Sequence, residues 1–190
     1  MRKIFISTLL VFISIPMMSQ SQSKEVGKVK LPTELMYNKQ NLILNGSGIR
    51  SKWFFNIYTI GLYLNQKNTN PQQIIEADET MGVRFEVTSK LLSRAKFASA
   101  FEEGFQKSTN GNIAQYRSRI QQFFNLMHDE IRVGNVYDVI YHKGIGTSVY
   151  YEGEKRGTIK GLDFKQALMG VWLSDLPANK RLKKELLALK

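Results

Sequence analysis

One arginine stands out among the residues that could do chemistry. Arg50 lies among apolar and aromatic residues in the stretch LNGSGIRSKWFFNIYTIGLYL, residues 44–64. A guanidinium stays charged at physiological pH, and burying it is costly unless an anion or a strongly polar group meets it. The partner of Arg50 is therefore either an acidic residue of the chain, such as Glu86 or Asp138, or the anionic group of a ligand.

Three phenylalanines are the second feature that could contribute to a binding site. Phe97, Phe101 and Phe105 are spaced four residues apart. On a helix this spacing stacks the rings along one face. Such a stripe is typical of a packed core, and it would also wall an apolar slot if the helix lay on a sheet. Arg50 beside that slot would give it a polar end.

Most motifs for metals, cofactors and nucleophilic catalysis are absent from the sequence. The chain has no cysteine and only two histidines, His128 and His142. Without clustered carboxylates at ligand spacing, we expect no metal and no cofactor. No phosphate-binding loop or nucleophile elbow occurs. Residues 46–48, Gly-Ser-Gly, precede a predicted strand rather than a helix, so we interpret them as a turn.

The N-terminus has the pattern of a secretory signal peptide. Arg2 and Lys3 precede an uncharged stretch, residues 4–18, that ends in small and polar residues. The stretch is shorter than the roughly 20 residues that a membrane-spanning helix needs. We therefore expect a signal peptide at residues 1–20, cleaved near residues 19–23, and export to the periplasm or to the outside of the cell.

The formal net charge of +11 favours contact with anionic surfaces. The densest basic cluster lies near the C-terminus, at Lys180, Arg181, Lys183 and Lys184. A solvated helix face is the usual explanation of such a cluster, and peripheral contact with an anionic membrane surface is the alternative. The other basic residues are scattered and the chain is predicted to be exported, so we expect no nucleic-acid partner.

The elements that must position Arg50 come in blocks of strands and helices. Residues 21–30 are polar and lack periodicity, so we expect a flexible lead-in and one ordered domain over residues 31–190. Apolar runs and turn residues predict strands at 35–37, 42–44, 53–64, 81–88, 136–142, 148–152 and 156–160, with hairpin turns at 38–41 and 45–48. Helical spacing predicts helices at 71–77, after Ser93, from 113 to about 130, at 162–173 and at 177–189. This order predicts an α+β fold, a largely antiparallel sheet with helices on one face.

Three stretches of the sequence, in this order, resemble the chalcone isomerase-like family. They are Gly46–Arg50 with Phe54–Tyr63, Ser93–Phe105 and Gly161–Ala178. The resemblance covers roughly residues 31–187, and the closing stretch is especially similar to the C-terminal helix pair of the exported bacterial branch of the family. It implies an open-faced β-sandwich, in which a layer of helices overlies a large antiparallel sheet and a ligand cleft lies between them.

The resemblance implies two possible functions. Plant enzymes of this family are isomerases, intramolecular lyases that cyclise a chalcone to a flavanone. Related members without that activity bind fatty acids, and the family arginine, which aligns with Arg50, meets the carboxylate. The other family positions are substituted here: the strand threonine by Tyr58, with Thr59 next to it, the helix tyrosine by Phe97, the asparagine by Gly104, and the serine or threonine of the penultimate helix by a residue near Lys165.

These substitutions favour binding over catalysis. Cyclisation needs preformed donors that stabilise an enolate oxygen, and neither Phe97 nor Gly104 has one. Arg50 and Tyr58 can still orient a carboxylate. We therefore expect a non-catalytic protein that binds a fatty acid or a similar hydrophobic carboxylate; the expected ligand-binding residues are Arg50, Tyr58, Thr59, Phe97 and Phe101.

Two alternatives remain open from the sequence. One is an isomerase of the chalcone isomerase type that acts on an unknown substrate, with Arg50 and Tyr58 as the catalytic pair. The other is a basic envelope protein with a filled core that binds anionic surfaces through the cluster at residues 180–184.

Overall fold

Seven strands of the protein form one antiparallel sheet. The computed structural model describes residues 22–52, 54–127 and 130–189. The order of strands in the sheet follows the chain, and each strand is antiparallel to its neighbours. The strands are β3 (Glu34–Tyr37), β4 (Gln40–Lys52), β5 (Phe55–Leu64), β6 (Met81–Val87), β7 (Val136–His142), β8 (Gly146–Tyr151) and β9 (Glu154–Ile159).

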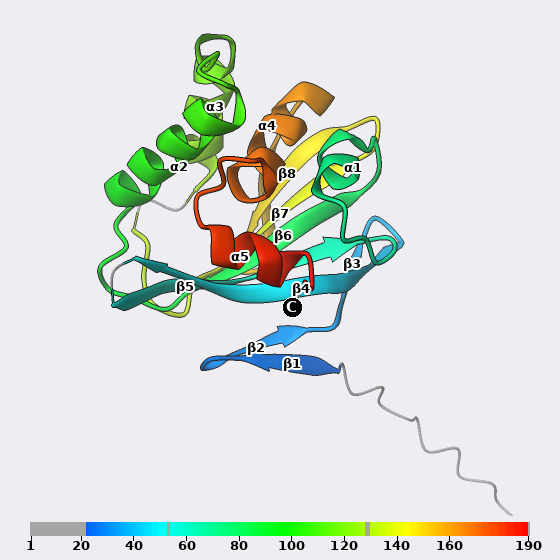
Figure 1. The fold of residues 1–190 in the computed structure, drawn as a ribbon, viewed down its shortest axis with the longest axis vertical. Helices are drawn as coiled ribbons and strands as arrows, with labels where there is room; N and C mark the ends of the chain where they lie inside the picture. The colour runs from blue at the N-terminus through cyan, green and yellow to red at the C-terminus, as the bar shows by residue number, and fades with distance from the viewer. Residues whose placement is uncertain (1–21, 53, 128–129, 190) are drawn as a thin grey trace, which may run out of the picture.

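Helices cover one face of this sheet, and a separate hairpin lies on the other (Figure 1). The helices are α1 (Pro71–Glu76), α2 (Arg94–Ser108), α3 (Arg117–Leu126) with a short 3-10 turn before it (η1, Ala114–Tyr116), α4 (Leu162–Leu173) and α5 (Lys180–Leu186). The hairpin consists of β1 (Ser23–Val26) and β2 (Val29–Pro32). The predicted fold class, an antiparallel sheet overlaid by helices, is confirmed.

The main hydrophobic core lies between the sheet and the helices. Alternate residues of β6, Val83, Phe85 and Val87, point into it, as the two-residue period of the sequence predicts. The aromatic stripe of α2 packs against them from the helix side. Because every second residue of a strand faces this core, the intervening residues face the opposite side of the sheet, which we call the outer face.

The predicted flexible lead-in at residues 21–30 is wrong, since most of it belongs to the hairpin. Val29 and Leu31 of β2 are buried, and Leu31 approaches the backbone of Gly61 on the outer face of β5. The two apolar residues alternate with lysines, so the short strand signal is hidden in a segment that is polar on average. Gly27 supplies the positive φ of +64° that the turn between β1 and β2 needs.

The predicted turn at residues 45–48 is also wrong, because β4 runs through it without interruption. A β-bulge between Leu44 and Gly46 is the only irregularity of β4 at this point. A side chain at Gly46 would collide with the last carbonyl groups of α5, and one at Gly48 would collide with Glu185. These glycines therefore let α5 lie directly on the strand. The hairpin turn falls instead between Lys52 and Phe55, and Trp53 lies outside the described residues.

The predicted signal peptide at residues 1–20 lies outside the described residues. Within the described ranges, no helix has the length and apolar character needed to cross a membrane.

Candidate functional site

Arg50 and Tyr58 are directly opposite each other in the sheet. The register of β4 and β5 pairs Arg50 with Tyr58, and opposite residues of an antiparallel pair point to the same face. Tyr58 is buried in the core between the sheet and the helices. Arg50 therefore lies on the helix-covered face as well, at the end of β4 and at the rim of the core. The structure brings together the two residues that the sequence analysis proposed as a pair.

The hydroxyl of Tyr58 has an unused hydrogen. The indole Nε1–H of Trp172, on α4, donates a hydrogen bond of 3.2 Å to the hydroxyl oxygen of Tyr58. No acceptor for the hydrogen of this hydroxyl is found among the described residues. Burial raises the pKa of Tyr58, while the bond from Trp172 and the charge of Arg50 act in the opposite direction. The group is therefore a neutral donor at physiological pH.

Arg50 is half-buried and forms no ion pair with any residue that the structure describes, although its charge is among the smaller causes that lower the pKa of Glu103 on α2. Its Nη1 donates to the backbone carbonyl of the next residue, Ser51. Glu86 cannot serve as its partner, because it faces the outer side of the sheet, opposite Thr59. Asp138 cannot do so either, since it also faces the outer side and is bound there by Arg84.

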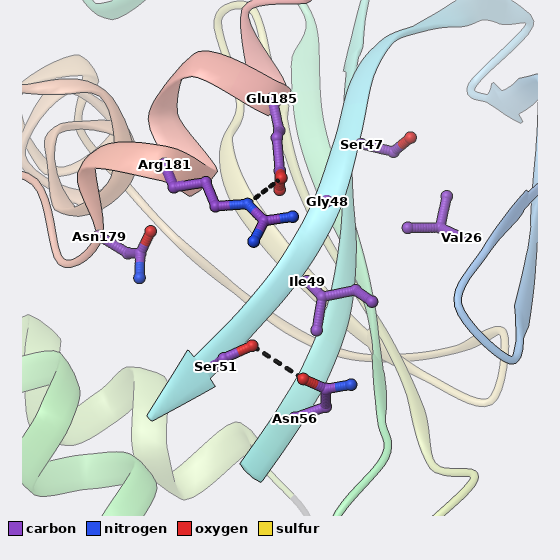
Figure 2. Close-up of a pocket in the computed structure, with 9 residues that line it drawn as sticks. All are labelled: Val26, Ser47, Gly48, Ile49, Ser51, Asn56, Asn179, Arg181 and Glu185. Carbon is purple, nitrogen blue, oxygen red and sulfur yellow. Dashed lines mark hydrogen bonds and ion pairs between the residues drawn. The ribbon is translucent and has the colours of Figure 1, made fainter. Parts of the chain in front are cut away.

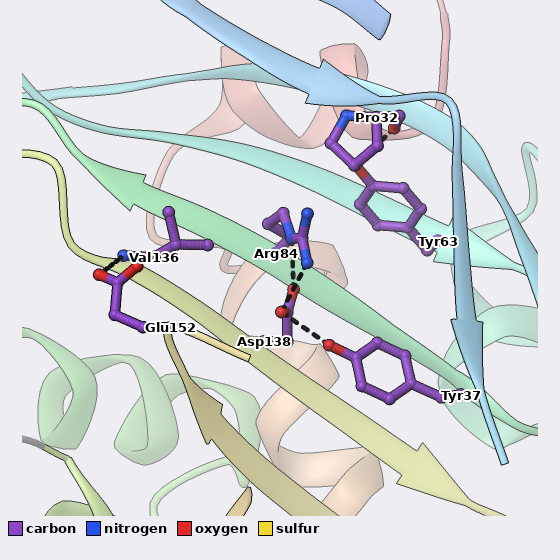
Figure 3. Close-up of polar contacts among 7 residues, drawn as sticks. All are labelled: Pro32, Tyr37, Tyr63, Arg84, Val136, Asp138 and Glu152. Carbon is purple, nitrogen blue, oxygen red and sulfur yellow. Dashed lines mark hydrogen bonds and ion pairs between the residues drawn. The ribbon is translucent and has the colours of Figure 1, made fainter. Parts of the chain in front are cut away.

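Asp138 is the centre of a buried polar cluster on the outer face (Figure 3). Arg84 donates from Nε to Oδ1 at 2.6 Å and from Nη2 to Oδ2 at 2.8 Å, and the hydroxyl of Tyr37 donates to Oδ2 at 2.7 Å. Burial, and then the neighbouring carboxylate, raise the pKa of Tyr37. The cluster ties β3 to β6 and β7. All polar partners of the carboxylate come from the chain, so this cluster is structural.

Phe97 and Phe101 are buried in the core rather than exposed in a slot. The ring of Phe97 lies 5.5 Å from that of Phe85, and the ring of Phe101 lies 5.5 Å from that of Trp172, between centroids. Both neighbours contact Tyr58, Phe85 through its ring at 5.6 Å and Trp172 through the hydrogen bond. The stripe is thus core, and it adjoins the Arg50–Tyr58 pair.

Thr59 does not join the other predicted site residues. It is buried, but it follows Tyr58 directly on β5 and so points to the outer face, opposite Ile49 and Glu86. The sheet itself separates its hydroxyl from Arg50 and Tyr58. Neighbouring residues of a strand cannot both face one site, and this rule excludes Thr59 from the pair.

Gly104 occupies the position of the family asparagine because α2 and α4 are in close contact there. A Cβ atom at Gly104 would lie 2.7 Å from Cγ1 of Val171. Real Cβ atoms do not approach other atoms this closely, so the position has no room for an asparagine side chain. The loss of this donor is therefore a consequence of how the two helices pack.

Lys165 has a structural role. Its ammonium is buried and donates to the carbonyl oxygens of Ile74, Ile75 and Ala77, at 2.9, 2.9 and 2.6 Å. These are unpaired carbonyl groups at the end of α1, which a cation satisfies well. Burial lowers the pKa of Lys165 to about 8. The side chain is fully engaged with α1 and is not available to a ligand at the Arg50–Tyr58 pair.

A groove of about 700 Å³ runs beside β4 (Figure 2). Val26 of β1 lies on one side of β4, and the ion pair of Arg181 and Glu185 on α5, at 2.7 Å, lies on the other. The hydroxyl of Ser51 and the amide oxygen of Asn56 close its lower end at 2.8 Å. Arg50 does not line this groove, although its neighbours Ile49 and Ser51 do. No sequence pattern reveals this groove, because its residues are far apart in the chain and share no motif.

The described part of the chain has no cluster of three or more histidine, aspartate or glutamate side chains that could hold a metal ion. His128 lies outside the described residues. His142 is buried on the outer face, where its ring nitrogens contact Asn38 and Tyr150, each at 3.2 Å.

The fold and the site define an open-faced β-sandwich, with helices over one face of an antiparallel sheet and an arginine–tyrosine pair at the rim of the core between them. The sequence model of chalcone isomerase-like proteins matches residues 23–188. The chain therefore belongs to the chalcone isomerase-like family.

A crystal structure of a fatty-acid binding protein from Arabidopsis thaliana has the same fold. It superposes with a TM-score of 0.69 at 18% sequence identity, over 87% of this chain and 96% of that chain. A search of curated protein sequences finds no significant match.

The contact of Gly104 with Val171 generates a testable prediction. We expect Gly104→Ala to lower the free energy of unfolding by about 1–3 kcal/mol, because the added methyl overpacks the contact between α2 and α4. In the double variant with Val171→Ala, which removes the colliding methyl groups, the total loss should be smaller than the sum of the two single losses. Urea unfolding of the three variants checks this, and additive losses would contradict the packing argument.

Proposed function

We propose that this protein binds a fatty acid or a similar hydrophobic carboxylate and does not catalyse a reaction. The carboxylate would accept hydrogen bonds from Arg50 and Tyr58. The observation that carries this proposal is the combination of an arginine without an ion-pair partner in the described ranges and a buried hydroxyl with an unused hydrogen, placed opposite each other at the rim of an apolar core.

The electrostatics of the rim favour an anion over a neutral ligand. Arg50 carries a guanidinium group and retains most of its N–H donors after its bond to Ser51. A charge-assisted bond to a carboxylate is stronger than a bond between neutral groups, especially where apolar side chains exclude water. Tyr58 adds a second donor on the same face. The pair would therefore hold the ligand by its head group.

The acyl chain would enter the space between the sheet and the first half of α2. The rings of Phe97 and Phe101 now occupy this space, so binding would require these rings to move aside. Their new neighbours would be the apolar methylene groups of the ligand, which limits the cost of the movement. The similarity in fold to a plant fatty-acid binding protein supports this class of ligand.

The isomerase alternative has less support. Arg50 and Tyr58 could polarise a carbonyl, but Phe97 is apolar and Gly104 has no room for a side chain. The chemistry needs several donors aimed at one oxygen. Turnover of a panel of enones that is lost in Arg50→Ala would favour an enzyme over the binding protein proposed here.

We further propose that residues 1–20 direct export of the protein to the periplasm or beyond. The support is the sequence pattern of two basic residues, an uncharged apolar stretch and small polar residues. N-terminal sequencing of the protein recovered outside the cytoplasm should place the first residue near positions 19–23. Recovery of the intact N-terminus there would contradict cleavage.

Substitution of Arg50 provides the main test of ligand binding. We expect wild-type protein, purified without added lipid, to release an acyl carboxylate on organic extraction, and native mass spectrometry to show the loaded form. Arg50→Gln should weaken binding of added palmitic acid by at least about tenfold, because the charged partner is lost. Tyr58→Phe should weaken it by a smaller factor, because one neutral hydrogen bond is lost.

The matched control for this test is Arg117→Gln on α3. Arg117 is exposed, and its substitution removes the same charge from a distant part of the surface. It should bind palmitic acid as the wild type does. Equal binding by wild type, Arg50→Gln and Tyr58→Phe would overturn the proposed site.

The position of the acyl chain gives a second prediction for this site. Phe97→Ala should lower stability by about 3–5 kcal/mol through the cavity that it creates. Palmitic acid should then raise the melting temperature of Phe97→Ala more than that of Phe164→Ala, because only the first cavity adjoins Phe85, the ring that packs against Tyr58. Phe164 is equally buried but packs against Phe105 and Phe123, at the far end of the core. An equal rise in both variants would argue against the proposed path of the chain.

A further inference from the structure

Two aromatic rings are exposed at the tip of the β4–β5 hairpin. Phe54 is 96% exposed and Phe55 is 55% exposed, although phenylalanine is usually buried. The turn that carries them lies at one end of the sheet, at the left in Figure 1. Single exposed apolar residues are ordinary on protein surfaces. Adjacent aromatic rings at the end of a projecting hairpin form a patch that needs an explanation.

The loop between β6 and α2 extends this patch. The backbone N–H of Thr88 donates to the carbonyl of Ile57 at 3.0 Å, and its hydroxyl donates to the carbonyl of Asn56 at 3.1 Å. These bonds hold the loop against the start of β5. The loop then exposes Lys90 and Leu91 on the same end of the sheet. We give the name aromatic tip to five of the exposed residues at this end: Lys52, Phe54, Phe55, Lys90 and Leu91.

The charge of the aromatic tip is positive. Lys52 and Lys90 flank the apolar side chains, and Lys96 is exposed one turn further along, on α2. The hydrogen bond and charge of Lys107, which binds the carboxylate of Glu103 on α2, are the main causes that lower the pKa of Glu103, and the charges of Lys52 and Arg50 contribute less. Apolar rings surrounded by lysines match a surface that offers hydrocarbon beneath anionic groups, which is the interface of an anionic lipid bilayer.

We propose that the aromatic tip docks the protein onto an anionic lipid bilayer. Phe54 and Phe55 enter the interface between head groups and acyl chains, while Lys52 and Lys90 contact the anionic head groups. This proposal does not require that the protein binds a fatty acid. Arg50 lies two residues before Lys52 on β4, so docking would also bring the rim of the core to the lipid surface, a consequence that rests on the proposed function.

The C-terminal basic cluster is less suited to this role. Arg181 forms an ion pair with Glu185 at 2.7 Å, and Lys183 donates to the carbonyl of Ser174 at 3.0 Å and lies 3.8 Å from the carboxylate of Asp175. Half of its four positive charges are thus engaged within the chain. It also lacks exposed aromatic rings. The lipid surface is therefore expected at the aromatic tip and not at α5.

A single labelled cysteine tests insertion directly. The chain contains no natural cysteine, so Phe54→Cys carries a polarity-sensitive fluorophore at one defined position. With vesicles of equal parts phosphatidylglycerol and phosphatidylcholine, the emission should shift to the blue. The matched control, Met36→Cys on β3, is 65% exposed and should not shift. An unchanged emission at position 54, or an equal shift at both positions, would overturn the proposal.

Vesicle flotation of delipidated protein measures how strongly each variant binds to the lipid surface, and so tests the contribution of the aromatic tip. Phe54→Ser with Phe55→Ser should weaken binding to anionic vesicles by about tenfold or more, since two inserted rings are lost. Lys52→Gln with Lys90→Gln should weaken it by a similar factor, since two basic residues that attract the anionic surface are lost. Pure phosphatidylcholine vesicles should bind the wild type weakly, and added salt should reduce binding to anionic vesicles.

Two control variants separate the aromatic tip from the rest of the surface. Met36→Ser with Ile145→Ser removes two exposed apolar side chains, 65% and 52% exposed, at the opposite end of the sheet. Lys180→Gln with Lys184→Gln removes two charges from α5. Both should float as the wild type does. Docking through the aromatic tip would be contradicted if the two aromatic-tip variants still bound the vesicles, or if only the α5 variant lost binding. Circular dichroism checks that each variant is folded.

Discussion

The sheet has to bury its helix-covered face while one residue of that face, Arg50, keeps its charge. Most of this face is closed by apolar side chains from β5, β6 and the helices. Arg50 escapes full burial because it lies near the end of β4, where the helix layer gives way to solvent. A cation at the rim of an apolar core, opposite a buried hydroxyl, is what gives this core a polar end. The proposed ligand and its orientation both depend on this arrangement.

The arrangement of charges on the outer face of the sheet explains why Asp138 does not form an ion pair with Arg50. Arg84 and Asp138 are neighbours across β6 and β7, and their two short hydrogen bonds satisfy both charges. A buried carboxylate must be paired, since an unpaired one would be strongly destabilising. Because this pair lies on the outer face, the sheet separates it from Arg50. The two arginines therefore have different roles, although the chain places both in strands of the same sheet.

Much of the fold could be predicted from local patterns in the sequence. The alternation of Val83, Phe85 and Val87 and the four-residue spacing of the phenylalanines on α2 both gave the correct buried faces. The errors arise where tertiary contacts override a local signal. Gly46 and Gly48 suggested a turn, but they are glycines because α5 lies against the strand, and no local pattern contains α5.

The candidate site was predicted only in part, for similar reasons. The resemblance to the family pointed to Arg50 and Tyr58, and the register of β4 with β5 places them opposite each other. Thr59 was included although the two-residue period of a strand puts it on the other face. Whether Arg50 had an internal partner could not be decided from composition, because that depends on which strands lie side by side. The exposed rings of the aromatic tip carried no signal at all, since a buried strand has the same apolar residues.

For the ligand binding proposed here, the packing of α2 limits where an acyl chain could enter the core. Gly104 fixes the second half of α2 against Val171 of α4, at a contact too close for any side chain. Phe97 and Phe101 lie in the first half of the helix, which begins directly after the loop of the aromatic tip. Entry of the proposed acyl chain at the first half of α2 would leave the contact of Gly104 with Val171 intact. It would also place the chain next to Phe85 and Trp172, the two residues that contact Tyr58.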